Sequence, residues 1–80
     1  MINVKDKNFT ILFGKNLRKL RKSKKLSQEN LAYDANIPIS QVGRIERGEI
    51  NTTISTVYAI SKALNLSHPK ELFDFELENK

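Results

Sequence analysis

Residues 39–47 carry the side chains whose types and spacing best suit hydrogen bonding to a nucleic acid. At about 3.6 residues per turn, one side of a helix here presents Ser40, Gly43, Arg44 and Arg47, flanked by Ile39 and Gln41. An arginine can donate two bonds to guanine, a glutamine can bond adenine in the same way, and a serine can pair with either base. A glycine lets the helix backbone approach a groove, and an isoleucine can contact a thymine methyl group. These residues predict a surface that reads base edges, and the alternative is an ordinary solvated helix face.

The same chain offers little for catalysis or for metal binding. It contains no cysteine and one histidine, His68, and these cannot build a zinc site of ordinary composition. The acidic residues Asp74, Glu76 and Glu78 lie close together near the C-terminus, where a run of charge is usually solvated. We therefore expect no enzyme activity, no metal and no cofactor.

Positive charge is concentrated at one end of the chain. The net charge is +5, and residues 1–25 hold nine basic and one acidic side chain, whereas 26–50 hold two and four and 51–80 hold three and four. Seven of the eleven residues in 15–25 are cationic, which indicates either phosphate attraction or a solvated helix face. Such a distribution favours a polyanionic partner, either a nucleic acid or an anionic membrane. We expect no membrane binding, because the apolar side of the first helix is needed for the core.

Eighty residues are expected to form a single domain, 1–80, with helices between about 9 and 77 and tails at 1–8 and 78–80. A chain of this length buries only roughly 60% of its unfolded surface, which leaves little room for a deep cleft. No run is long and apolar enough to span a membrane, and the start lacks the apolar core of a signal peptide. We therefore expect a cytoplasmic protein.

Helical periodicity extends over nearly the whole sequence and predicts an all-α fold of about five short helices. Phe9, Phe13, Leu17 and Leu20 form an apolar stripe over 9–24. Further helices are expected over 28–35, 38–47 and 54–64, and a short fifth helix opens at Ser67 or His68. The fourth helix is expected to place its apolar residues on one face, namely Ile54, Val57, Ile60 and Leu64, together with Ser61.

Residues that start and stop helices mark these boundaries. Ser27 is expected to cap the second helix, with Asn30 in place of the usual Glu or Gln of a capping box, so that the cap is only partial. Asn36 tolerates the left-handed conformation that ends helices, and Gly48 provides the next stop. Pro38 suits the first position of the third helix, because its missing N–H has no helical partner there.

Two short helices joined by three or four residues have the spacing of a helix-turn-helix. Around it, the run SQENLAYDANIPISQVGRIERGEINTTISTVYAISKALN resembles the Cro/repressor-type (XRE-like) helix-turn-helix regulators of bacteria and phages. The resemblance extends from about Phe13 to Phe73, and its most specific parts are LRKLRKSKKLSQENLA, VGRIERG and ISTVYAISKALNL. It implies a lambda-repressor-like DNA-binding domain. The sequence departs from the family pattern at Pro38, where Ser or Thr is frequent, and at Asn36, where glycine is usual.

The resemblance also implies roles for individual residues. The positions that read bases in the family are occupied here by Ile39, Ser40 and Arg44, to which the outward face adds Gln41 and Gly43. Positions that contact the DNA backbone are occupied by Gln28, Arg47, Asn51 and Thr52. The family pattern also places Arg21 opposite Glu46, as a partly buried ion pair that braces two helices.

Apolar residues near the C-terminus exceed what the core needs. Leu72 and Phe73 are expected to close the core, which leaves Phe75 and Leu77, with Tyr58 nearby, as candidates for a homodimer interface. The alternative is that these residues pack against the first helix, beside Ile11 and Leu12.

Together, these observations predict a transcriptional regulator that binds a near-palindromic double-stranded DNA operator as a homodimer, without a small-molecule ligand. A phage switch protein and the controller protein of a restriction–modification system both fit. One alternative is an antitoxin that binds DNA and also a toxin, and another uses the third helix as a protein contact.

Overall fold

The computed structural model describes residues 6–77. It contains four α-helices, α1 (Lys7–Ser23), α2 (Gln28–Ala35), α3 (Ile39–Glu46) and α4 (Ile54–Ala63), followed by the 3-10 helix η1 (Pro69–Phe73). The all-α prediction is confirmed, but the predicted fifth helix is only a 3-10 turn. Because α1 begins at Lys7 and η1 ends at Phe73, the helical part is shifted from the predicted 9–77. Of the predicted tails, residues 1–5 and 78–80 lie outside the described residues.

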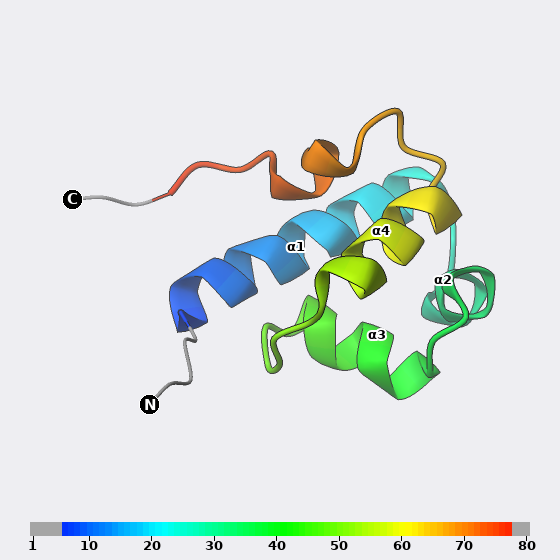
Figure 1. Ribbon diagram of the computed structural model, residues 1–80, viewed down its shortest axis with the longest axis horizontal. Coiled ribbons are helices and arrows are strands. Elements are labelled where there is room, and N and C mark those ends of the chain that lie inside the picture. The colour runs from blue at the N-terminus through cyan, green and yellow to red at the C-terminus, as the bar shows by residue number, and fades with distance from the viewer. Residues whose placement is uncertain (1–5, 78–80) are drawn as a thin grey trace.

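The helices surround a single core, with α1 as the long central element (Figure 1). In this view α4 slopes in nearly the same direction as α1, and the segment from η1 towards the C-terminus runs along the upper side of α1. Helix α2 is seen nearly end-on whereas α3 lies across the view, so the two cross at a steep angle. This is the arrangement expected for a helix-turn-helix.

The start of α2 and the turn after it follow from side chains of the sequence. The Ser27 hydroxyl accepts a bond from the Asn30 backbone N–H at 2.9 Å, and the Asn30 side-chain oxygen accepts one from the Ser27 backbone N–H at 3.4 Å. The capping box is therefore complete, and the prediction of a partial cap was wrong because Asn30 reaches the same donor that Glu or Gln would. Asn36 ends α2 in the left-handed conformation, as predicted, with φ 60°.

Helix α3 begins one residue later than predicted. Pro38 has an extended conformation, φ −63° and ψ 143°, and is the residue before the helix rather than its first member. It makes no side-chain hydrogen bond to the first turn, since a proline side chain has no polar atom. Ile39 is thus the first residue of α3.

Ten apolar side chains form the buried core: Phe13, Leu17, Leu31, Ala32, Ala35, Val42, Ile45, Ile60, Leu64 and Leu72. Of the other apolar residues predicted for the core, Leu20 and Val57 are half-buried against it, and Phe9, Ile54 and Phe73 are exposed. Ile54 is 88% exposed, because it is the first residue of α4 and its side chain points back beyond the start of the helix. Phe73 is 42% exposed, because one side of its ring packs against Phe9 and Phe13 while the other faces solvent.

A glycine allows α1 and α3 to approach each other closely. A Cβ atom on Gly14 would lie 2.5 Å from the carbonyl oxygen of Glu46 and closer still to that of Ile45. Above this contact, the Thr10 hydroxyl donates a hydrogen bond of 3.1 Å to the carbonyl of Gly48, which has a φ of +74°. These contacts fix α3 against α1, and its opposite side remains available to solvent.

A single buried amide attaches η1 to α1. The Asn16 Nδ2 group donates to the carbonyl oxygens of Glu71, at 2.9 Å, and Leu72, at 2.8 Å. Leu72 is fully buried, so the contact also holds the last core side chain in place.

Candidate nucleic-acid interface

The outer side of α3 is polar, and its inner side is apolar. Val42 and Ile45 are buried in the core. The residues predicted to contact DNA from this helix are exposed or half-buried, with one exception: Ile39, Ser40, Arg44 and Arg47 are exposed, and Gln41 is half-buried. One face of α3 therefore presents a hydroxyl, an amide and two guanidinium groups to solvent.

Gly43 is the exception, and its predicted role needs correction. It is buried rather than open to an approaching groove. A Cβ atom here would lie 3.0 Å from Nη1 of Arg47 and 3.7 Å from Oε1 of Gln28. Gly43 is therefore covered by two longer side chains of its own protein, a feature that helical periodicity does not reveal.

An ion pair between α1 and α3 lies directly behind this face. Arg21 donates to Glu46 through Nε, at 2.6 Å to Oε2, and through Nη2, at 3.1 Å to Oε1. The Nη1 group of Arg21 also donates to the Leu26 carbonyl at 2.8 Å. Both side chains are buried, with 9% of Arg21 and 3% of Glu46 exposed. The two residues that the family resemblance brings together are thus a bidentate pair.

Gln28 is hydrogen-bonded to this pair. Its Nε2 group donates to Oε1 of Glu46 at 3.0 Å, and the side chain is half-buried. The amide predicted to contact a phosphate is therefore bonded to the Arg21–Glu46 pair, at the start of α2.

Basic side chains surround Gln28 on the surface. An open hollow between α1, α2 and α3 is lined by Arg18, Lys22, Gln28 and Arg47, with the Arg21–Glu46 pair at its side. Arg18 and Lys22 were not predicted as site residues, although both lie in the basic stretch 15–25. Their spacing of four residues puts them on one face of a helix, which is the signal that identifies them.

Glu49, just after α3, holds the two arginines of the outer face. Its carboxylate accepts bonds from Nε of Arg47 at 2.7 Å and from Nη2 at 3.3 Å, and its Oε1 lies 3.9 Å from Nε of Arg44. The hydrogen bond from Arg47 lowers the pKa of Glu49 below its ordinary value, and the bond to Glu49 raises the pKa of Arg47. All three side chains remain solvent-exposed.

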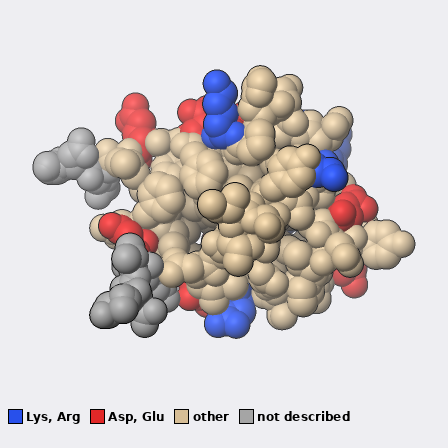
Figure 2. All heavy atoms as spheres, viewed as in Figure 1, with Lys and Arg blue, Asp and Glu red and all other residues tan. Residues whose placement is uncertain are grey.

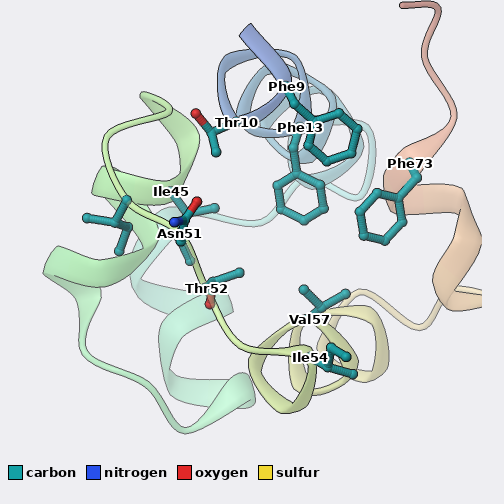
Figure 3. A pocket seen from close by; sticks show the side chains of 10 residues that line it. Phe9, Thr10, Phe13, Ile45, Asn51, Thr52, Ile54, Val57 and Phe73 are labelled. Atoms are coloured by element: carbon teal, nitrogen blue, oxygen red, sulfur yellow. The ribbon is translucent and has the colours of Figure 1, made fainter. Parts of the chain in front are cut away.

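The predicted DNA-backbone contacts Asn51 and Thr52 line a different part of the surface. They form one wall of an apolar hollow of about 200 Å³. Phe9 and Phe13 of α1, Val57 of α4 and Phe73 of η1 line the same hollow (Figure 3). The Thr52 hydroxyl is buried and has no hydrogen-bond partner among the described residues.

The face that carries α4 is largely uncharged (Figure 2). Ile54, at the rim of the apolar hollow, is its most exposed apolar residue, and Tyr58 on α4 is 56% exposed. Leu77 is 58% exposed, but it lies beside α1, where it lines a hollow with Ile11 and Leu12.

Phe75 is less exposed than expected for a residue of a homodimer interface. Its ring is half-buried and packs against Phe9, with 5.4 Å between the ring centroids. Phe75 therefore packs against the first helix, which is the alternative given above. Tyr58 and Leu77 remain exposed.

Between residues 6 and 77, no cluster of three or more His, Cys, Asp or Glu side chains is arranged to hold a metal ion. None of the helices described above has the length and apolar character needed to cross a membrane.

A family model, curated relatives and solved structures all relate the chain to helix-turn-helix proteins or to controller proteins. Residues 17–70 match the model of the helix-turn-helix family. The chain is 41% identical over 69 residues to control protein C.BamHI of Bacillus amyloliquefaciens, which covers 85% of this chain and 84% of that protein. It is 38% identical over 53 residues to the immunity repressor protein of Bacillus phage phi105, which covers 66% of this chain and 37% of the repressor. The restriction–modification controller protein C.AhdI from Aeromonas hydrophila superposes with a TM-score of 0.78 and 41% identity, over 80% of this chain and 96% of the controller.

Proposed function

The chain belongs to the helix-turn-helix family and is a DNA-binding transcriptional regulator, and we propose that it binds a near-palindromic operator as a homodimer, with α3 in the major groove. We further propose that residues 1–80 act as one domain and that the regulated genes belong to a restriction–modification system. The similarity to two controller proteins over most of their length supports this last point.

The observation that carries the proposal is the polar outer face of α3 on a helix whose inner face is fixed in the core. Side chains that read bases must be held by a rigid element, and Val42 and Ile45 provide that attachment. On this basis the residues that read base edges are Ile39, Ser40, Gln41 and Arg44. Gly43 lies beneath the side chains of Arg47 and Gln28.

Phosphate contacts are proposed for the basic hollow beside α3. Arg18, Lys22 and Arg47 provide cationic groups there, and Gln28 provides an amide at the start of α2. Such contacts position a protein on the duplex but carry no sequence information. The predicted backbone contacts of Asn51 and Thr52 have less support, because both line the apolar hollow.

For the homodimer, we propose the uncharged face around α4 as the interface, with Ile54 and Tyr58 at its centre. Exposed apolar side chains beside an apolar hollow suit self-association, because burying them removes apolar surface from water. A two-fold dimer would place its two α3 helices about 34–36 Å apart, one turn of duplex.

The test of the proposed function is selection of bound duplexes from a random-sequence pool at two salt concentrations. We expect an enriched near-palindrome with half-sites one helical turn apart. Binding only at low salt, without an enriched motif, would contradict operator recognition and leave general phosphate affinity.

Arg44→Ala is expected to lose about 1–3 kcal/mol of operator binding and to relax the preference at one base pair, because a bidentate arginine contact discriminates among bases. The matched control is Arg47→Ala, which should weaken the operator and a random duplex by similar factors. Fluorescence anisotropy titrations with the selected operator and its single-base variants measure both. An Arg44→Ala protein that keeps the wild-type base preference would remove Arg44 from the reading role.

Ile54→Asp is expected to shift the protein from dimer to monomer without unfolding it, since Ile54 is exposed in the single chain. Tyr33→Asp is the control, because Tyr33 is equally exposed on α2, away from the proposed interface. Sedimentation velocity gives the mass of each protein. A dimer that persists in Ile54→Asp would exclude this face as the interface.

A further inference from the structure

Backbone contacts hold Glu49 against the two arginines of the outer face of α3. The Glu49 N–H donates to the Arg44 carbonyl at 2.9 Å, which turns the chain back over the end of the helix. Gly48 makes the turn possible with its left-handed φ of +74°. The position of the carboxylate therefore follows from the helix ending itself.

The bonds to Glu49 use Nε and Nη2 of Arg47, the edge with which a guanidinium group can bind a phosphate through two bonds. Arg47 binds both carboxylate oxygens, at 2.7 and 3.3 Å, as it would bind two oxygens of a phosphate. Arg44 is held more loosely, at 3.9 Å. A phosphate that binds this edge of Arg47 takes the place of Glu49, and the displaced carboxylate then lies beside a polyanion.

We propose that Glu49 is an internal competitor of DNA phosphate, which occupies Arg47 in the free protein and is displaced on binding. This inference rests on the proposed function, because it assumes that the outer face of α3 binds DNA. Competition from Glu49 lowers the affinity of that face for DNA. The limit applies to every sequence, since phosphate contacts do not distinguish bases.

Glu49→Gln is expected to tighten binding to the operator and to a random duplex by a similar factor, about two- to fivefold. The effect is small because an exposed ion pair contributes little free energy. The slope of log K against log salt should stay unchanged, because Arg47 neutralises one phosphate in the complex of both proteins. Anisotropy titrations over a salt series measure both quantities.

Two matched variants separate competition from simple charge. Glu29→Gln removes the same charge from the first turn of α2, beside Gln28, where Glu29 forms no ion pair with the described residues. We expect less than half the gain of Glu49→Gln. In an Arg47→Gln background, Glu49→Gln should gain no more than Glu29→Gln does. Equal gains in Glu29→Gln and Glu49→Gln, a full gain of Glu49→Gln that persists without Arg47, or weaker binding in Glu49→Gln would each overturn the proposal.

A measurement without DNA distinguishes failure of this inference from failure of the proposed function. The Nε–H resonance of Arg47 should shift in Glu49→Gln and stay in place in Glu29→Gln, and no shift in either would overturn the proposed contact. A wild-type protein that binds no duplex at any salt concentration would overturn both proposals. Duplex binding that Glu49→Gln leaves unchanged would overturn only the competitor.

Discussion

Glu46→Ala is expected to lower the free energy of unfolding by about 3–5 kcal/mol, because it leaves the buried guanidinium of Arg21 without its anion. Of the Arg21 hydrogen bonds described above, only the bond to the Leu26 carbonyl would remain. Gln28 would lose its acceptor as well. Urea unfolding followed by circular dichroism measures the loss.

The matched control for this prediction is Glu49→Ala, which removes a carboxylate from an exposed arginine pair. Exposed pairs contribute about 0–1 kcal/mol, so the unfolding midpoint should hardly move. A double variant, Arg21→Met with Glu46→Leu, should recover much of the stability lost in Glu46→Ala, since no unpaired charge is left in the core. Equal losses in Glu46→Ala and Glu49→Ala would contradict the structural role of the buried pair.

Gly14→Ala is expected to destabilise the domain by about 1–3 kcal/mol or more, because the added methyl group meets backbone carbonyls of α3. Backbone atoms cannot rotate away, so α1 and α3 must separate. Operator affinity should fall together with stability, as α3 loses its fixed position.

Gly43→Ala is the control for Gly14→Ala, since both are helix-interior glycines. The nearest atom to a Cβ on Gly43 is the guanidinium of Arg47, at 3.0 Å, the far end of a flexible side chain. The helix propensity of alanine gains up to about 1 kcal/mol over glycine and offsets the contact. Denaturant midpoints that fall equally in Gly14→Ala and Gly43→Ala would show that the close approach of α1 and α3 is not what Gly14 provides.

The helix order and most boundaries follow from local chemistry, which is why the sequence predicts them. Ser27 and Asn36 act through bonds to their own neighbouring backbone. The short η1 is different, because five residues with few apolar positions do not specify an α-helix over a 3-10 turn. The tertiary bond from Asn16, which lies 55 residues earlier, helps hold it.

The site was predicted less completely, and the misses share a cause. Helical periodicity assigns each residue to one face of its helix, but it does not show which side chains from other positions cover that residue. Gly43 lies on the outer side of α3, yet side chains from two other positions cover it. Ile54 has the right spacing for the core, but it begins its helix and extends past its neighbours. Arg18 and Lys22 join the hollow through the packing of α1 on α3, which a single sequence does not specify.

The bond from Asn16 to η1 has a consequence for the newly made chain. Synthesis delivers Phe13 and Asn16 first, and Leu72 emerges after all four α-helices. At roughly 5–20 residues per second, the interval between Phe13 and Leu72 is roughly 3–12 s. Helical domains fold in microseconds to milliseconds once complete. The ribosome, rather than the folding barrier, therefore sets the time at which each new chain completes its core.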